Sequence, residues 1–249
     1  MTLADSARPV VLITGAARRL GAHTARRLHG AGYDVVLHCR HSRNDLDRLR
    51  DELETNRPDS TLALQADLAD LAQIPPLVSA TLARFGRLDA LVNNASAFYA
   101  TPLGQIGAAQ WDDLFASNAR APLFMAQAAA PALRASRGAI VNMLDLYASQ
   151  PLRDHVVYSM AKSAQATMTL ALAQELAPEV RVNGIAPGAI LWPDAPHADA
   201  HRDQIIARTL LQRVGTPDEI ADAVLWLLRD ATFMTGQVLH VDGGRLPGV

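Results

Sequence analysis

Tyr158 and Lys162 are the two residues whose types and spacing most directly suggest acid–base chemistry. They are four positions apart in a segment expected to be helical, so both side chains lie on one helix face. A neighbouring ammonium favours the tyrosinate, and we expect it to lower the phenol pKa from about 10 toward neutral pH, as proton donation requires. Taken alone, the same spacing is also typical of an ordinary surface pair, so the rest of the chain must decide.

Lys162 is the only lysine among the 23 basic residues of this 249-residue chain. Arginine is a planar group that stays charged, whereas lysine is a compact point charge whose pKa changes readily on burial. A lysine retained in such an arginine-rich chain is either an accident or occupies a position that arginine cannot fill. Its place four residues after Tyr158 favours the second interpretation.

The segment Thr14–Gly21 (TGAARRLG) follows a short apolar run and precedes a helical pattern. Gly15 and Gly21 allow the backbone to approach a pyrophosphate closely, and the start of a helix offers free N–H groups and a partial positive charge. Arg19 stands where a Gly-x-x-x-Gly-x-Gly pattern would have its middle glycine, and with Arg18 it adds two positive charges. The sequence therefore predicts a phosphate site here, with a plain strand–helix turn as the alternative.

The end of the second expected strand distinguishes NADH from NADPH, because a carboxylate there binds the ribose 2′-OH and an arginine accommodates a 2′-phosphate. Asp34 lies 19 residues after Gly15, near the usual spacing, but it stands at the start of the strand. The end of the strand reads HCRHSR from His38 to Arg43, with two arginines and no carboxylate. NADPH is favoured, and a solvated charged surface is the alternative.

Short apolar runs and helical patterns alternate along the chain, which predicts an α/β fold with a doubly wound parallel sheet of about seven strands and helices on both faces. The expected strands are Val10–Thr14, Asp34–Cys39, Thr61–Gln65, Leu88–Asn93, Ala139–Met143, Val180–Ile185 and Val238–Val241. The expected helices are about Arg19–Ala31, Asn44–Thr55, one ending near Phe85, Trp111–Ala135, Val157–Leu176 and Pro217–Leu228. We expect one domain over residues 1–249. Pro187–Ala200 is irregular and long, which indicates a lid-like loop around 187–212.

Composition narrows the class of protein further. Hydrophobic residues make up 49% of the chain and charged residues 19%, which is typical of a globular protein, and the net charge of −2 argues against a general nucleic-acid-binding surface. One cysteine, Cys39, excludes an internal disulfide framework. His197 and His201 are four apart, but no supporting metal-binding motif surrounds them. No signal peptide or membrane span is recognisable, so we expect a cytoplasmic protein.

Taken together, the motifs resemble those of the short-chain dehydrogenase/reductase family over nearly the whole chain. The matching pieces are the glycine turn, Asp67-Leu68, Asn93-Asn94-Ala95, Asn118, Tyr158 with Lys162, Pro187-Gly188 and Val241-Asp242-Gly243-Gly244. The resemblance implies a single Rossmann domain, a nicotinamide cofactor and a homotetramer.

The resemblance also implies roles for individual residues. Tyr158 would donate a proton, Lys162 would hold the nicotinamide ribose, and Asn118 would support a proton-relay water. Asp67 would contact the adenine, and Asn94 would shape the nucleotide site through its backbone. The full set of expected NADPH-binding residues is Gly15, Arg18, Arg19, Leu20, Gly21, His38, Arg40, His41, Ser42, Asp67, Leu68, Asn94, Ala95, Ser96, Tyr158, Lys162, Pro187, Gly188 and Ile190.

Asp145 departs from the usual pattern of the family, which has a serine thirteen residues before the tyrosine. A carboxylate would repel the developing alkoxide of a ketone, but it suits a ligand that presents N–H donors, such as an aminopyrimidine. Asp145 resembles the pteridine reductase branch, as do the arginine in the glycine turn, Ser96 and Phe98 after Asn-Asn-Ala, and Gln150-Pro151-Leu152. A structural or helix-capping role for Asp145 is the alternative.

The resemblance implies an NADPH-dependent reductase that transfers hydride to a C=N bond of a pterin or folate, such as dihydrobiopterin, dihydromonapterin or dihydrofolate. The proton would come from the Asp145–Tyr158 pair, and Phe98 would stack on the pterin. The expected substrate-binding residues are Arg19, Ser96, Phe98, Asp145, Tyr158, Leu191 and Trp192. The alternatives are a carbonyl or 3-oxoacyl reductase and a non-catalytic NADPH-sensing regulator.

Overall fold

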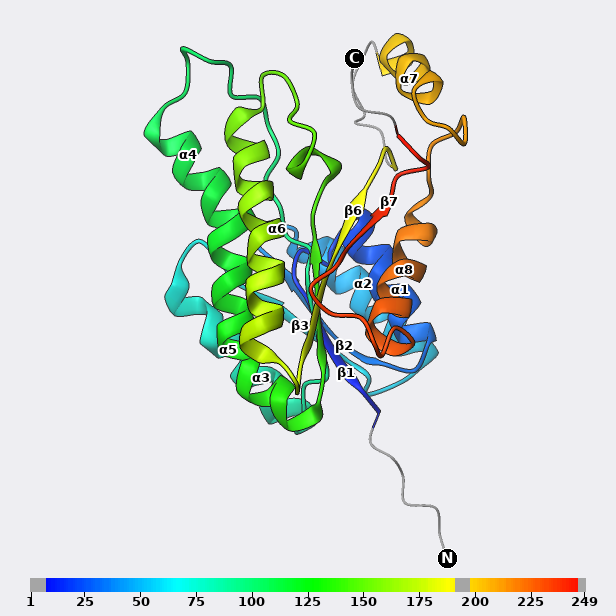
Figure 1. Cartoon of the computed structure of the whole chain (residues 1–249). Coiled ribbons are helices and arrows are strands. Elements are labelled where there is room, and N and C mark those ends of the chain that lie inside the picture. The colour runs from blue at the N-terminus through cyan, green and yellow to red at the C-terminus, as the bar shows by residue number, and fades with distance from the viewer. Residues whose placement is uncertain (1–7, 191–197, 246–249) are drawn as a thin grey trace, which may run out of the picture.

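The computed structural model describes residues 8–190 and 198–245, and the structural statements below concern these residues. A seven-stranded sheet forms the centre of the molecule, with the strand order β3-β2-β1-β4-β5-β6-β7 (Figure 1). Every neighbouring pair of these strands is parallel. The strands are β1 Val10–Ile13, β2 Asp34–Cys39, β3 Thr61–Gln65, β4 Ala90–Asn93, β5 Ala139–Met143, β6 Arg181–Pro187 and β7 Val238–Val241. The predicted doubly wound parallel sheet is confirmed.

Helices cover both faces of the sheet (Figure 1). On one face lie α1 (Arg19–Gly30), α2 (Arg43–Asn56) and α8 (Pro217–Arg229). On the other lie α3 (Ile74–Phe85), α4 (Ala108–Phe115), α5 (Ala121–Ser136) and α6 (Val156–Leu176). Short turns η1 (Leu71–Gln73), η2 (Ala116–Arg120) and η3 (Leu146–Ala148) and the helix α7 (Ala198–Ala207) complete the described chain.

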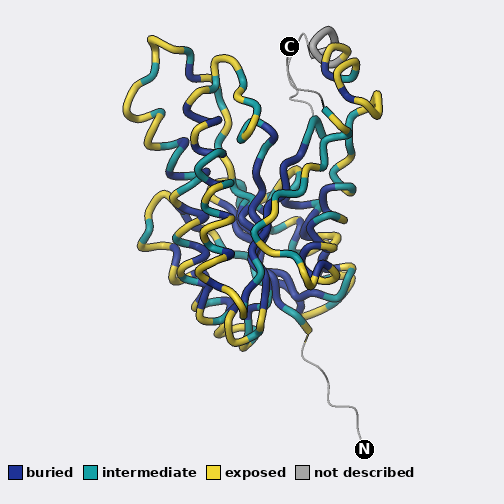
Figure 2. The backbone as a smooth tube through the Cα atoms, viewed as in Figure 1, coloured by how far each residue is buried: buried dark blue, intermediate teal, exposed yellow. Residues whose placement is uncertain are grey.

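The core consists of two apolar layers, one on each face of the sheet, and the strands stand out as the buried centre of Figure 2. Successive side chains of a strand point to opposite faces, so Val11 and Ile13 of β1 enter one layer while Val10 and Leu12 enter the other. A strand covered on both faces needs apolar residues at every position. This requirement explains the continuous apolar runs of the sequence.

Two expectations about secondary structure were incomplete. The helix expected at Trp111–Ala135 is interrupted by the π-helical turn η2, in which the N–H of Ala121 bonds the carbonyl of Ala116 five residues earlier. The segment expected to be an irregular lid contains α7, and its residues 191–197 lie outside the described part of the chain.

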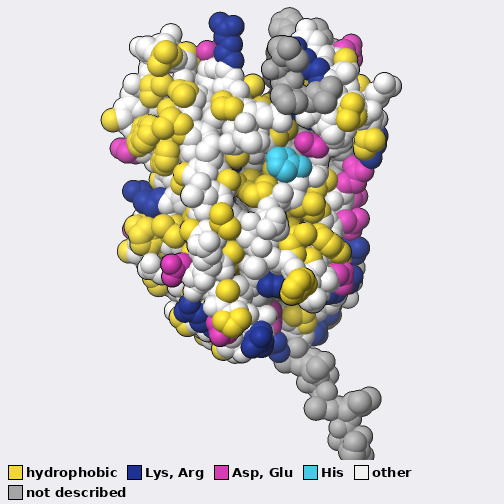
Figure 3. Space-filling model, in the orientation of Figure 1, with side chains coloured by type: hydrophobic (Ala, Val, Ile, Leu, Met, Phe, Trp, Pro, Cys, Tyr) yellow, Lys and Arg dark blue, Asp and Glu magenta, His cyan; other side chains and the backbone are white. Residues whose placement is uncertain are grey.

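The surface carries charges of both signs. On the face shown in Figure 3, the basic and acidic side chains are scattered rather than gathered by sign. In the part of the chain that the structure describes, no helix combines the length and the apolar character that crossing a membrane requires.

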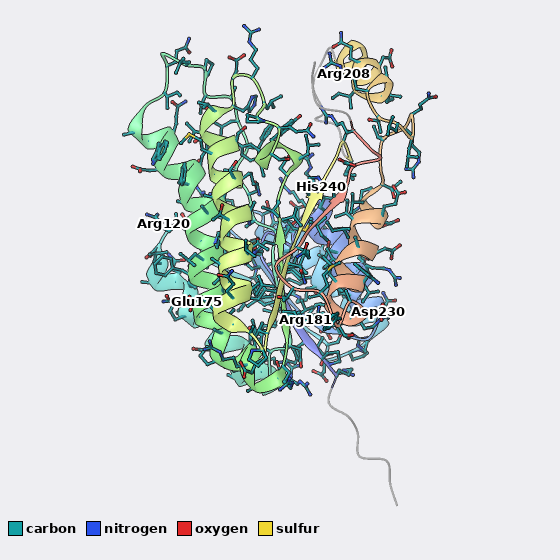
Figure 4. All side chains as sticks on the ribbon, in the orientation of Figure 1. Arg120, Glu175, Arg181, Arg208, Asp230 and His240 are labelled. Carbon is teal, nitrogen blue, oxygen red and sulfur yellow. The ribbon has the colours of Figure 1, made fainter. Side chains whose placement is uncertain are left out.

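Arg181, the first residue of β6, ties the sheet to the C-terminal end of α8. Its guanidinium donates to the carbonyl oxygens of Leu227 at 2.7 Å, Leu228 at 2.8 Å and Ala231 at 3.0 Å. Figure 4 shows Arg181 at the same end of α8 as Asp230. The last carbonyls of a helix have no partner within it, and a cation there also interacts favourably with the helix dipole.

Replacing Arg181 with methionine is therefore expected to lower the free energy of unfolding by about 2 kcal/mol, since three carbonyls lose a charged donor. The matched control is Arg229→Met, which removes an arginine whose partner, Asp230, is its exposed neighbour in the sequence. Exposed ion pairs contribute little, so this variant should be nearly as stable as the wild type. Urea unfolding curves measure both, and equal stabilities would contradict the proposed role of Arg181.

Candidate active site

A cleft of about 900 Å³ opens at the carboxyl ends of the strands. It lies where the strand order reverses between β1 and β4, which is the usual ligand-binding position of a doubly wound sheet. Among the residues predicted from the sequence, those that line it are Gly15, Arg18, Arg19, Leu20, Gly21, His38, Arg40, Asp67, Leu68, Asn94, Ala95, Ser96, Phe98, Asp145, Tyr158, Lys162, Pro187, Gly188 and Ile190. His41 and Ser42 are not part of its lining, and Leu191 and Trp192 lie outside the described residues.

The glycine turn between β1 and α1 is closely packed against the end of β4. Gly15 has a φ of +65°, and a Cβ atom there would lie 2.9 Å from the Cα atom of Ala95. A Cβ atom on Gly21 would lie 2.2 Å from the carbonyl oxygen of Gly15. Neither position can accept a larger residue without moving backbone, so both glycines are required for the shape of the cleft floor.

Thr14 and Asn94 fasten the ends of β1 and β4 together. The hydroxyl of Thr14 accepts the backbone N–H groups of Asn94 at 2.9 Å and Ala95 at 3.0 Å. The amide Nδ2 of Asn94 donates to the carbonyl oxygens of Thr14 at 2.9 Å and Gly15 at 3.0 Å. Asn94 was expected to shape the site through its backbone, and its side chain also holds the two strand ends together. The role of Thr14 was not predicted.

His38 connects the glycine turn with the end of β3. The N–H of Gly15 donates to Nδ1 of His38 at 3.3 Å, and Nε2 lies 3.0 Å from the carbonyl oxygen of Ala66. Because Nδ1 accepts, the proton must be on Nε2, which donates to Ala66. Burial lowers the pKa of His38, so the ring is neutral. It supports the cleft wall rather than supplying a charge.

Arg18 and Arg40 are paired with carboxylates; Asp67 was expected in the cofactor site, but the pairings themselves and the carboxylates of Asp45 and Asp113 were not predicted. Arg18 forms an ion pair with Asp45 at the start of α2. Arg40 lies 3.6 Å from Asp67 and 3.8 Å from Asp113. These pairs come from separate elements, so no spacing in the sequence could have revealed them.

Asp145 and Tyr158 meet at the centre of the cleft. The phenol of Tyr158 donates to Oδ2 of Asp145 at 2.8 Å, and Oδ1 of Asp145 accepts the N–H of Tyr147 at 3.0 Å. Asp145 thus caps η3 and binds the phenol at the same time. The capping role, considered from the sequence as an alternative, does not exclude the predicted chemical role, because a carboxylate has several acceptor positions.

Burial dominates the electrostatics of this pair. It raises the pKa of Asp145 above its usual range. The pKa of Tyr158 is also raised, first by burial and then by the negative charge and hydrogen bond of Asp145. The expectation that Lys162 lowers the phenol pKa is therefore wrong for this structure, since the carboxylate binds the phenol directly while the ammonium lies 5.9 Å from the ring centroid.

Lys162 is fully buried below the phenol. Its ammonium donates to the carbonyl oxygen of Met143 at 2.8 Å and to Oε1 of Gln165 at 3.0 Å. Burial lowers its pKa to about 8, against an opposing contribution from Asp145. A larger, planar guanidinium would not fit this enclosed position, which agrees with the retention of lysine in this chain.

Asn118 lies in the π-helical turn η2, behind the cleft wall. Its amide Nδ2 donates to the carbonyl oxygens of Ala97 and Leu114, both at 2.9 Å, and its Oδ1 accepts the hydroxyl of Ser96 at 2.6 Å. Such turns often occur at functional sites because they place a side chain that a regular helix would turn away. Here the turn brings Asn118 to Ser96, which lines the cleft.

Phe98 forms an aromatic wall at the outer part of the cleft. Its ring stacks on His155 with centroids 4.8 Å apart, and it meets the ring of Tyr158 edge-on at 4.8 Å. The side chain is 52% exposed, so the arrangement leaves apolar ring surface open. Sequence reasoning missed His155, Tyr147 and Arg245, which line the same cleft. The guanidinium carbon of Arg245 lies 5.8 Å from the ring centroid of Tyr147. None of the three belongs to a recognisable motif.

No group of three or more histidine, cysteine or acidic side chains within residues 8–190 and 198–245 could hold a metal ion. The chemistry that the described cleft offers is therefore that of a phenol, a carboxylate and a buried ammonium beside a glycine turn.

Comparison with known proteins identifies the family of this chain. The sequence family described as "Enoyl-(Acyl carrier protein) reductase" matches residues 15–245. The chain belongs to the short-chain dehydrogenase/reductase family. Members of this family use NAD(P)H and are oxidoreductases.

Individual relatives within the family carry different names. The chain is 38% identical to Pteridine reductase 1 of Leishmania tarentolae, with 98% of each chain covered. It is 32% identical to the 3-oxoacyl-acyl-carrier-protein reductase FabG of Staphylococcus aureus, with 94% of this chain and 96% of the relative covered. A crystal structure of a short-chain dehydrogenase/reductase (glucose/ribitol dehydrogenase) from Brucella melitensis matches with a TM-score of 0.88 and 30% identity, covering 96% of this chain and 97% of the other.

Arg19 provides a test of the glycine turn, because its φ of +51° lies in the left-handed region that favours glycine. Such a conformation costs a non-glycine residue about 1 kcal/mol. We expect Arg19→Gly to raise the free energy of unfolding by up to about 1 kcal/mol. Arg18→Gly is the control, since Arg18 has an extended backbone with φ −143° and gains no such relief. Denaturant unfolding of both variants measures the difference; a loss of stability in Arg19→Gly equal to that in Arg18→Gly would contradict it.

Proposed function

We propose that this protein is an NADPH-dependent reductase that transfers hydride to a C=N bond of a pterin or folate. The observation that carries the proposal is the partly buried Asp145 carboxylate hydrogen-bonded to Tyr158 at 2.8 Å. A carboxylate in this place is unsuited to a developing alkoxide and well suited to the N–H groups of an aminopyrimidine. The likeness to Pteridine reductase 1 supports the same substrate class.

The residues of the cleft are compatible with a dinucleotide cofactor. Gly15 and Gly21 leave no room for a side chain at the turn, so the backbone and the N-terminus of α1 are open to a pyrophosphate. Arg40 follows β2 with its side chain about half exposed and lies near carboxylates at 3.6 Å or more. A guanidinium at the end of β2 supports the choice of NADPH over NADH. Lys162, at the floor of the cleft, would hold the nicotinamide ribose.

Two residues would orient the substrate. Phe98 would stack on the flat face of the pterin with its exposed ring, which packs against His155 and Tyr158. Asp145 would bind the polar edge of the pterin. Each of its oxygens already accepts one hydrogen bond and keeps a further lone pair for a substrate N–H. Ser96 and Arg19, on the lining of the same cleft, would bind the remaining polar groups of the pterin.

The chemistry divides between the cofactor and the chain. When bound, NADPH supplies the hydride that the C=N carbon accepts. Tyr158 and Asp145 hold the proton that the ring nitrogen requires: burial raises the pKa of both groups, and the phenol of Tyr158 keeps its proton at neutral pH. Lys162 stays near the phenol and compensates for the charge that remains on the pair after proton transfer.

A carbonyl or 3-oxoacyl reductase is the second candidate, because the likeness to FabG covers 94% of the chain. A homotetramer remains a prediction that follows from the family, and a cytoplasmic location remains a prediction from the sequence. The exposed apolar side chains Leu123 of α5 and Met160 and Leu170 of α6 are surfaces that such an assembly would cover.

The substrate proposal is tested by following NADPH oxidation with four substrates in parallel. Dihydrobiopterin, dihydromonapterin and dihydrofolate represent the pterins, and a 3-oxoacyl thioester represents the alternative. We expect turnover with at least one pterin, much slower turnover with the thioester, and a preference for NADPH over NADH. Turnover of the thioester with no activity on any pterin would refute the proposal.

Asp145→Ser tests the mechanism. We expect pterin turnover to fall by about a hundredfold, as is typical for loss of an acid–base group, while NADPH binding remains. In the wild type, the rate should fall as the pH rises through the pKa of Asp145, above the ordinary range of a carboxyl group, and this limb should vanish in the variant. Asp222→Ser, on the outer surface of α8, is the control. Unchanged turnover in Asp145→Ser would remove this carboxylate from the mechanism.

A further inference from the structure

The surroundings of Lys162 contain a residue with no assigned function, Gln165. An ammonium has three N–H donors, and in this structure two of them are used by the carbonyl oxygen of Met143 at 2.8 Å and by Oε1 of Gln165 at 3.0 Å. Gln165 is 1% exposed and lies three residues after Lys162 on the same helix face. One N–H of the ammonium is left for the cleft, which Lys162 lines.

Gln165 is fixed in place by a chain of buried polar groups that crosses from the sheet to α6. Nδ2 of Asn93 donates to Oδ1 of Asn142 at 2.9 Å, and Nδ2 of Asn142 donates to the hydroxyl of Thr169 at 2.9 Å. That hydroxyl donates to the backbone carbonyl of Gln165, also at 2.9 Å. Asn93, Asn142 and Thr169 are each at most 1% exposed. The position of Gln165 is therefore tied to both β4 and β5.

The orientation of the Gln165 amide follows from its neighbour. With the oxygen toward Lys162, the NH₂ group is buried and has no hydrogen-bond partner within the described chain. The opposite orientation would place the NH₂ donors against the N–H donors of the ammonium, which is repulsive. A buried donor without a partner lowers stability, and leucine or methionine would fill the space without that loss. Within the described chain, the hydrogen bond from Lys162 is therefore the one that the Gln165 side chain makes.

We propose that Gln165 is a positioning residue for Lys162: together with the Met143 carbonyl it fixes the ammonium beneath Tyr158 and directs its remaining N–H toward the cofactor site. The proposal concerns the lysine itself and holds for any substrate of the enzyme. The charged or titratable groups that face Lys162 are Tyr158, one turn earlier on α6, and Asp145, which follows β5. Gln165 acts on the ammonium as a neutral acceptor beside them.

The composition of the chain permits a direct test. Because Lys162 is the only lysine, protein made with isotopically labelled lysine gives a single Cε resonance, and its chemical shift against pH reports the titration of this one ammonium. Burial lowers the pKa of Lys162 to about 8, so the wild-type midpoint falls in a range where the folded protein can be studied. The measurement needs no substrate, so it stands or fails independently of the pterin assays.

Three variants separate positioning from packing. Gln165→Leu removes an acceptor from the charged form and is expected to lower the midpoint by about one pH unit, whereas the nearly isosteric Gln165→Glu adds a carboxylate and should raise it by at least as much. Thr169→Val breaks the same buried network without touching Lys162, so its unfolding midpoint should fall while the lysine titration stays in place. NADPH binding should weaken in Gln165→Leu, because the ammonium loses one of the two acceptors that fix its position.

The titration curves decide the matter. Opposite displacements in Gln165→Leu and Gln165→Glu, with Thr169→Val unmoved, would establish the positioning role. Identical midpoints in the wild type and both Gln165 variants would overturn it, as would an equal displacement in Thr169→Val. Gln165→Glu keeps the size and shape of the side chain, so the test survives even if Gln165→Leu fails to fold.

Discussion

The hydrogen bonds between Thr14 and Asn94 are the constraint on which the site depends. They join the ends of β1 and β4, the two paired strands at which the strand order of the sheet reverses. By holding the glycine turn against β4, they fix the cleft floor and allow Gly15 and Gly21 to pack as closely as they do. Asp145 follows the end of β5, and α6 brings the phenol of Tyr158 and the ammonium of Lys162 to the same edge of the sheet.

Burial sets the chemistry within that frame. Tyr158 and Lys162 are buried and Asp145 is partly buried, and in each case burial is the largest cause of the pKa shift. Burial disfavours every charged form, so the acids hold their protons more tightly and the lysine holds its proton less tightly. A site of this kind exchanges protons readily among its members. Its behaviour is a property of the group as a whole and cannot be assigned to one residue alone.

The relatives of this chain show why the fold does not settle the substrate. Proteins named as a pteridine reductase and as a 3-oxoacyl-acyl-carrier-protein reductase match it over nearly the same length. The sheet, the glycine turn and the Tyr158–Lys162 pair are general features of the family. Asp145 and Phe98 line the cleft beside these shared features, and it is at such positions that function varies on a common fold. Our substrate proposal depends on these two residues.

The sequence by itself determined the order of strands and helices, the glycine turn and the pairing of Tyr158 with Lys162, because each depends on local spacing or on apolar runs. Tertiary structure alone decided which partner Tyr158 has, since Asp145 arrives from another element and outweighs the lysine. It also decided the ion pair of Arg18 with Asp45, the neutral state of His38 and the contact of Lys162 with Gln165. These depend on burial and on distances between elements, and neither quantity is encoded in the spacing of residues along the chain.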